Sequence, residues 1–205
     1  RGNQILALQD IDTNEALFSS TTHGDGTITY SLTKDIIWGP NTISMGATPI
    51  RSQQFIELFP NEHLDGSGFQ IKIESSNVGL FDGWCNATDT SDMVMDASFH
   101  SHVSHLSLDF TPSPRFITWG NGGLFCRGQV FLSVYHCSVR GICETFYSGG
   151  LIGQEAGSHN GQVLLEDCET KCLFYNSYFV GGMVGFNSGT ENGSLLLRRC
   201  YGTPS

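Results

Sequence analysis

Three short segments in the second half of the chain alternate apolar and polar residues, and each ends in a cysteine. The apolar side chains lie five and three positions before the cysteine, and the cysteines follow one another at intervals of 31 and 32 residues. Such alternation puts every second side chain on the same face of a strand. Because it recurs at one period, the strands are predicted to stack with like residues in columns. The columns comprise Leu132, Val134, Cys137, Val163, Leu165, Cys168, Leu195, Leu197 and Cys200.

A second element, built from glycine and large apolar residues, lies between these strands. Residues 149–153 read Gly-Gly-Leu-Ile-Gly and residues 181–185 read Gly-Gly-Met-Val-Gly, while residues 122–126 repeat the pattern with Cys126 in place of the last glycine. Glycine adopts positive φ angles without steric cost, so tight turns are predicted at these positions. The predicted turn glycines are Gly79, Gly123, Gly150, Gly153, Gly182 and Gly185.

The alternation extends towards the N-terminus at less regular spacing. Leu106 and Leu108, and before them Ile71 and Ile73, are assigned to the same columns, with Thr111 at the position of the cysteine. A period near 30 with glycine turns and no helical segment predicts an all-β chain, folded as a parallel β-helix (solenoid) of about four to five coils. A β-sandwich of short strands is the alternative, although it gives no reason for a single recurring period.

The repeat divides the chain into two parts. Residues 1–64 lack it, whereas residues 65–205 carry it, with a long insert at 82–105. Exposed edge strands invite polymerisation, so we expect residues 1–64 to form an N-terminal cap, or else a docking segment. The chain stops eight residues after Leu197. We therefore expect an open last coil that docks on a protein partner or on another copy.

The repeat units match a known sequence pattern. Residues 150–153 (Gly-Leu-Ile-Gly) are followed by Leu165-x-x-Cys168, and residues 182–185 (Gly-Met-Val-Gly) by Leu197-x-x-Cys200. These units, with an entry segment at 65–81, resemble GLUG-type repeats. The resemblance implies a right-handed parallel β-helix of the pectate-lyase-like kind, found in surface adhesins, large secreted bacterial proteins and virus-encoded proteins. It also implies repeats that carry no catalytic residues.

The charge balance excludes several classes of partner. The chain has 20 Asp and Glu against 10 Lys and Arg, a net charge of −10. Nucleic acids and anionic membrane surfaces attract positive surfaces, so neither is expected to bind this chain. No run of about 18 apolar residues is present, so direct membrane insertion is not predicted either.

Three groups of residues are candidates for chemistry. His100, His102 and His105 form the most metal-like cluster, because alternate residues of a strand point the same way and imidazoles bind zinc or nickel. Ordinary surface histidines are the alternative reading of the same residues. Asn86 and Asn192 each open a glycosylation triplet.

The remaining polar repeat positions are interpreted as structural. Glu166 and Asp167 are expected to form either a polar corner or ion pairs with Arg198 and Arg199 of the next coil. The cysteine column is expected to hold free thiols, because parallel Cβ vectors poorly suit the torsion of a disulfide. No cofactor is predicted.

These features favour a non-enzymatic structural or attachment module in an extracellular or virion-surface assembly. Its faces and its open last coil are expected to contact protein partners. The alternative is a carbohydrate-active enzyme or a glycan-binding module on the same fold, because two carboxylates about 5–9 Å apart suffice for glycan hydrolysis.

Overall fold

The structure is a computed structural model, and its backbone is described over most of the chain. Side chains are described over the same residues except 116–119 and 143–146. The described residues are 4–50, 56, 58–59, 61–74, 80, 101–111, 116–119, 131–146, 149–158, 160–174 and 180–202.

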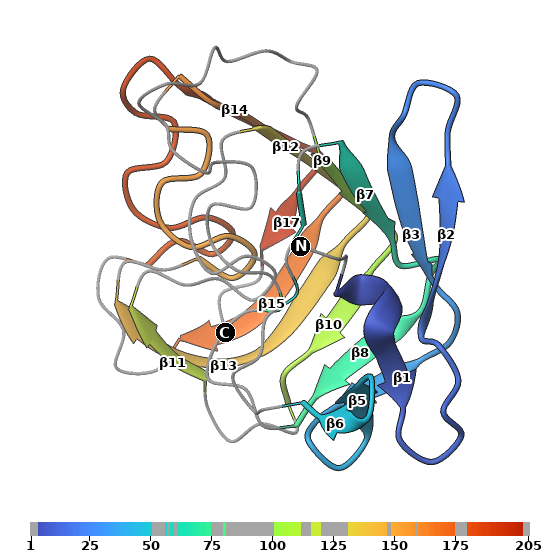
Figure 1. Ribbon diagram of the computed structural model, residues 1–205. Helices are drawn as coiled ribbons and strands as arrows, with labels where there is room; N and C mark the ends of the chain where they lie inside the picture. Colours follow the sequence, from blue (N-terminus) through green and yellow to red (C-terminus); the bar gives the residue numbers. More distant parts are fainter. Residues whose placement is uncertain are drawn as a thin grey trace.

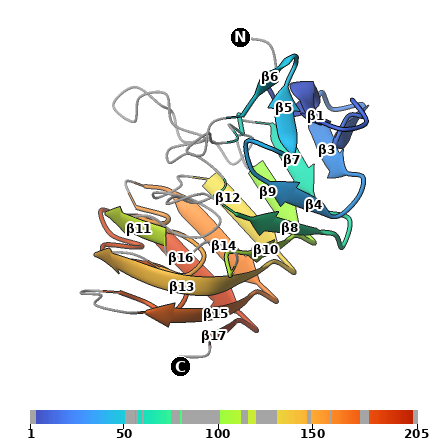
Figure 2. The same ribbon diagram turned by 90° about the horizontal axis from the view of Figure 1, so that it is seen from below.

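Two parallel sheets run along the molecule and meet at a corner, which makes the chain a β-solenoid of about four turns (Figures 1 and 2). The first sheet contains β3 (Ile28–Leu32), β7 (Glu62–Asp65), β9 (Ser101–Ser104), β12 (Phe131–Tyr135), β14 (Gln162–Glu166) and β16 (Ser194–Arg198). The second contains β4 (Ile36–Trp38), β8 (Gln70–Ile73), β10 (Ser107–Asp109), β13 (Ser138–Phe146), β15 (Glu169–Phe174) and β17 (Tyr201–Gly202). The predicted fold class is confirmed.

A level is defined here as one strand of the first sheet together with the strand of the second sheet that follows it in sequence. The four regular turns run from β7 to β16, and the level of β3 and β4 precedes them. β11 (Phe116–Trp119) adds a short parallel strand beside the second half of β13. Between the last levels the glycine-rich segments also stack, because Gly149 pairs with Gly181, and Ile152 with Val184.

Columns of apolar side chains fill the interior, as the alternation predicts. Leu132 lies beside Val163 and Val134 beside Leu165, in the register of the repeat. One column passes through every level of the first sheet and is used below as a reference. This reference column comprises Tyr30, Leu64, Val103, Val134, Leu165 and Leu197.

The assignment of the earlier strands is wrong by one strand. Ile71 and Leu108 pair with each other and with Val139 in the second sheet, not with the columns of the first. Residues one position before these pairs therefore form the corner column, so Leu106 and not Thr111 stands where later levels have cysteine. Both strands of a level alternate in the same way, and the irregular spacing left the sequence without a marker to distinguish them.

The solenoid also begins earlier than the repeat indicates. The parallel strands β3 and β4 lie within residues 1–64, and the boundary predicted between 64 and 65 falls inside β7. The predicted insert 82–105 is too long at its end, because residues 101–104 form β9. These levels keep the alternation but lack the cysteine and the glycine element that mark the later ones.

An N-terminal cap covers the level of β3 and β4. It consists of η1 (Ile5–Ala7), the antiparallel strands β1 (Leu8–Asp10), β5 (Ile43–Met45) and β6 (Thr48–Pro49), and β2 (Phe18–Thr22) antiparallel to β3. Buried apolar side chains of the cap, including Ile5 and Leu17, join the same core as Tyr30 and Trp38. The expectation of a cap therefore agrees with the packing of residues 4–50, although this part of the chain also supplies solenoid strands.

The predicted role of the turn glycines needs correction. Gly150, Gly153, Gly182 and Gly185 are not among the residues with positive φ, whereas Gly79 and Gly123 lie outside the described residues. The positive φ values occur at the corner between the sheets, on non-glycine residues. These are His105 (53°), His136 (51°), Asp167 (52°) and Arg199 (50°). Close packing explains Gly150 instead, because a Cβ there would lie 2.6 Å from the carbonyl oxygen of Gly182.

Candidate functional site

The last level of the solenoid forms an edge at which both sheets end among the described residues. β16 ends the first sheet and β17 ends the second. Leu197 belongs to the reference column but is 42% exposed, whereas Leu165 and Val134 in the preceding levels are fully buried. An inward-facing apolar side chain is thus left in contact with solvent at this edge.

Other residues of the same level are exposed for the same reason. Leu196 is 49% exposed and Tyr201 is 62% exposed. Cys200 is only partly buried, whereas Cys137 and Cys168 below it are buried. A Cβ on Gly182 would meet no atom within 4 Å, although its counterpart Gly150 packs tightly against the next level. We call β16, β17 and the corner between them the C-terminal edge.

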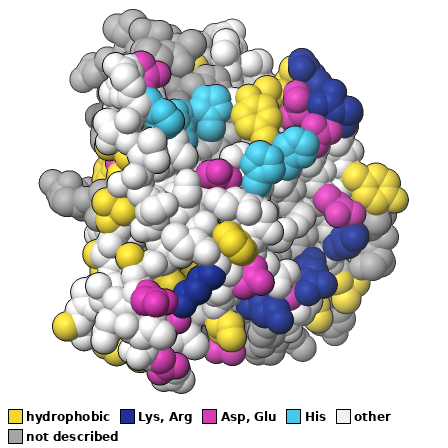
Figure 3. Space-filling model, turned by 90° about the vertical axis from the view of Figure 1, so that its right-hand side faces the viewer, with side chains coloured by type: hydrophobic (Ala, Val, Ile, Leu, Met, Phe, Trp, Pro, Cys, Tyr) yellow, Lys and Arg dark blue, Asp and Glu magenta, His cyan; other side chains and the backbone are white. Residues whose placement is uncertain are grey.

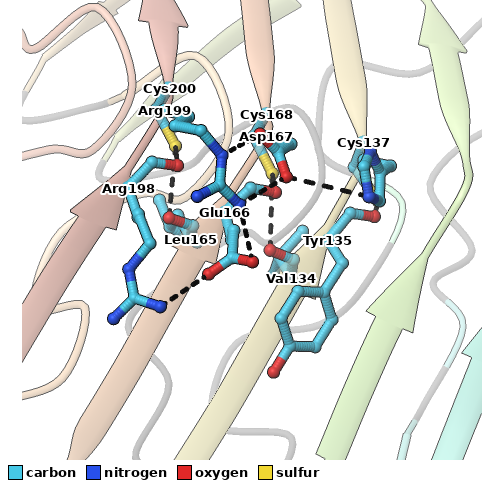
Figure 4. A network of polar contacts seen from close by, with 11 residues as sticks. Val134, Tyr135, Cys137, Leu165, Glu166, Asp167, Cys168, Arg198, Arg199 and Cys200 are labelled. Atoms are coloured by element: carbon cyan, nitrogen blue, oxygen red, sulfur yellow. Dashed lines mark hydrogen bonds and ion pairs between the residues drawn. The ribbon is translucent and has the colours of Figure 1, made fainter.

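Charged residues occupy the corner beside this edge (Figure 4). Arg199 donates from Nε and Nη2 to the two carboxylate oxygens of Asp167 at 2.7 and 2.9 Å, and also from Nη2 to Glu166 at 2.9 Å. Arg198 donates from Nη1 to Glu166 at 3.2 Å. The two arginines are 53% and 60% exposed, and the acids are 20% and 26% exposed. The cross-coil ion pairs expected from the repeat are present.

The ion pairs shift the acid–base properties of the corner. Hydrogen bonds from Arg199 lower the pKa of Asp167, and the same contacts raise the pKa of Arg199. Both groups are therefore charged at neutral pH. The charge of Arg199 belongs permanently to the last level.

The cysteine column lies on the inner side of the same corner. Each thiol contacts a carbonyl oxygen of the preceding level: Cys168 Sγ lies 3.5 Å from Val134 O, and Cys200 Sγ lies 3.2 Å from Leu165 O. Burial raises the pKa of Cys168 to about 12. A thiol in this state is a poor nucleophile and a poor metal ligand. The described cysteines 137, 168, 172 and 200 are free, which agrees with a packing role.

Each predicted metal-binding histidine that the structure describes is paired with a histidine from a neighbouring level. His102 lies over His63, with ring centroids 4.5 Å apart, and its backbone N–H donates to His63 Nδ1 at 3.0 Å. The His105 ring stacks on that of His136 at 5.1 Å. His100 lies outside the described residues. No group of three or more potential metal ligands is present in the part of the chain that the structure describes.

The histidines gather beside the charged corner on one side of the molecule (Figure 3). Carboxylates flank the stacked pair: Asp65 lies 3.7 Å from His105, and Asp167 lies 3.8 Å from His136. His63 and His136 were missed in the sequence because each belongs to a different level from its partner. Only the pair His105 and His136, 31 residues apart, carries the period of the repeat as a signal.

A shallow groove of about 190 Å³ crosses the outer face of the second sheet. Its polar lining comprises Gln70, Ser107, Ser138, Arg140, Glu169 and Lys171. Beside it, Arg140 donates to the carboxylate of Asp109 at 2.6 Å, and only 2% of that carboxylate side chain is exposed. Burial raises the pKa of Asp109, but hydrogen bonds from Arg140 and Thr111 outweigh it and hold the pKa below the ordinary value.

Of the two predicted glycosylation positions, Asn192 lies in an exposed turn before β16, and Asn86 lies outside the described residues. No helix among the described residues has the length and apolar character needed to cross a membrane.

Comparison with known proteins found no matching family model, no matching curated protein and no matching solved structure. The GLUG-like character of the repeats therefore stays a prediction.

Proposed function

We propose that this protein is a non-enzymatic structural module that joins a protein assembly through its C-terminal edge. In this proposal a partner chain adds a β-level to β16 and β17 and thereby continues both sheets. An extracellular or virion-surface assembly is the setting that the repeat resemblance implies.

The observation that carries the proposal is the exposure of Leu197 in a column that is otherwise buried. Fully burying a leucine side chain contributes about 2 kcal/mol. The outer side of an edge strand also offers backbone N–H and C=O groups to a further strand, which is how β-strand addition gains affinity. Both contributions are available at the C-terminal edge and are absent at the capped end.

The test uses the full chain and a labelled peptide with the sequence of residues 161–174, which contains one complete level of this solenoid. We expect saturable binding in fluorescence anisotropy and slower hydrogen exchange at the amides of residues 194–202. The variant Leu197→Lys places an ammonium group in the apolar contact, so we expect binding to be at least about tenfold weaker.

A matched control is Leu6→Lys, which changes an equally exposed leucine (42%) at the capped end. This variant is expected to bind the peptide as the unmodified chain does. Circular dichroism checks that both variants are folded. If the amides of β16 gain no protection, or if both lysine variants weaken binding equally, the C-terminal edge is not the assembly surface.

Glycan binding is the second candidate, favoured by the groove on the second sheet. Its hydroxyl, amide and charged side chains are the kinds of group that hydrogen-bond to sugars. Hydrolysis is less well supported, because a general acid needs a raised pKa and that of Asp109 is lowered. Titration with maltohexaose, followed by NMR, tests this candidate: shifts confined to Ser107, Ser138 and Lys171 support it, and unchanged spectra contradict it.

A further inference from the structure

The corner of the C-terminal edge has a charge pattern that selects among partners. The corner positions of the last two levels are Glu166-Asp167 and Arg198-Arg199, and the ladder register stacks the second pair directly on the first. Carboxylates thus lie on one side of the two guanidinium groups. The other side faces the position that the next level would occupy.

The two guanidinium groups have donors to spare. Arg199 uses Nε and Nη2, and Arg198 uses Nη1, in the hydrogen bonds to Glu166 and Asp167. A guanidinium group has five N–H donors in a planar fork, so each side chain keeps donors beyond these contacts. More than half of each side chain is exposed. Charge-assisted hydrogen bonds to carboxylates are the strongest that such donors form.

We infer, on the basis of the proposed function, that the partner is a chain whose docking level carries two consecutive carboxylates at its corner. These carboxylates bind Arg198 and Arg199 from the open side, so that the arginines lie between two acidic levels. The partner's inward apolar side chains cover Leu197 at the same time. The corner therefore sets which chain docks and in which register.

Two further features favour a different chain over a second copy of this one. A second copy presents the same edge, with the same two arginines and no carboxylate to meet them. Moreover, this chain carries a net charge of −10, so an acidic partner is repelled over most of the surface. At physiological salt that repulsion is screened beyond about 8 Å, and the local attraction at the corner decides the register.

The experiment compares two peptides on the full chain. One has the native sequence of residues 161–174 with its Glu-Asp corner, and the other carries Glu166→Lys and Asp167→Lys. We expect the native peptide to bind at least about tenfold more tightly in fluorescence anisotropy, because the lysines oppose Arg198 and Arg199. The preference is expected to shrink in about 1 M NaCl, where the Debye length is about 3 Å.

The chain variant Arg198→Gln with Arg199→Gln removes the guanidinium groups without placing new charge beside Glu166. It is expected to abolish the preference between the peptides. The control Lys72→Gln with Lys171→Gln removes two exposed cations from the second sheet and is expected to preserve that preference. A preference that survives loss of both arginines would overturn the inference.

The outcomes separate this inference from the proposed function. If both peptides bind equally and protect β16, strand addition stands and the charge selection is wrong. If neither peptide binds, the proposed function itself fails. If sedimentation velocity shows that the chain alone dimerises, and Leu197→Lys abolishes the dimer, the occupant is a second copy and the inference is wrong.

Discussion

The two ends of the solenoid treat the same interior column in opposite ways. At the capped end Tyr30 is 2% exposed, although it belongs to the first level of the first sheet. At the other end Leu197 is 42% exposed. The difference lies in the neighbours, because β2 and the small antiparallel sheet cover the first level and no described strand covers the last.

The comparison teaches that a solenoid level is stable only as far as its neighbours bury it. Stacking satisfies each strand from both sides, so an end level gains about half of the contacts of an interior one. An antiparallel strand such as β2, with exposed polar residues at 19–22, ends the parallel series and presents an edge unsuited to another level. The C-terminal edge keeps the parallel series open.

The largest expected contrast is between two leucines of the reference column. Leu165→Ala is expected to reduce the free energy of unfolding by about 3 kcal/mol, because it leaves a cavity between two packed levels. Leu197→Ala is expected to cost less than about 1 kcal/mol, since its side chain is already partly in water. Urea unfolding at equal protein concentration measures both. Equal costs would mean that the end level is covered in solution.

The paired glycines sharpen the same contrast without changing an apolar side chain. Gly150→Ala is expected to cost about 2 kcal/mol, because the new methyl group meets backbone of the next level. Gly182→Ala meets open space and is expected to stay within about 0.5 kcal/mol of the parent. Thermal unfolding compares the two variants directly. A destabilising Gly182→Ala would show that another segment packs there.

An interior ion pair should depend on pH more than its counterpart at the edge. The pKa of Asp109 is below its ordinary value of 3.8, so its contribution to stability is complete above pH 3.8 and is lost as the pH falls through the lower folded value. Arg140→Ala is expected to cost about 1 kcal/mol at neutral pH, because Arg140 is half exposed. Unfolding well below pH 3.8 is expected to show a smaller difference. A pH-independent difference would argue against the pairing.

The smallest effect is expected at the edge itself. Arg199→Gln removes the bidentate contact with Asp167, but both groups are exposed and screened by solvent. We expect a smaller shift of the melting temperature than for Arg140→Ala, and no shift in about 1 M NaCl. A large shift that persists in high salt would indicate that the corner ladder is a main source of stability.

The later levels were predictable because three independent signals coincide in them. Alternation, the terminal cysteine and the glycine element all recur at 31 or 32 residues, so the columns through Leu165 and Leu197 follow from the sequence. The levels of β3 and β7 carry alternation alone, and alternation is common to both sheets. A strand such as Ile71–Ile73 therefore could not be assigned to one sheet before its pairing with Leu108 was known.

The candidate site was predictable to a similar extent. The ion pairs of Arg198 and Arg199 follow from the repeat, because equivalent positions stack. The pairs His63–His102 and Asp109–Arg140 did not, since their partners lie on different levels at spacings that loops of unequal length determine. Adjacent histidines in the sequence, such as His102 and His105, were instead assigned to one cluster.

By itself, the sequence determined that the chain stacks short strands with like residues in contact, because a fixed period of apolar positions can be buried in no simpler way. Only the tertiary structure decided where the solenoid begins, which strand belongs to which sheet, and which end is covered. Those features depend on contacts between segments without a shared period, whose energies arise only when the segments pack together.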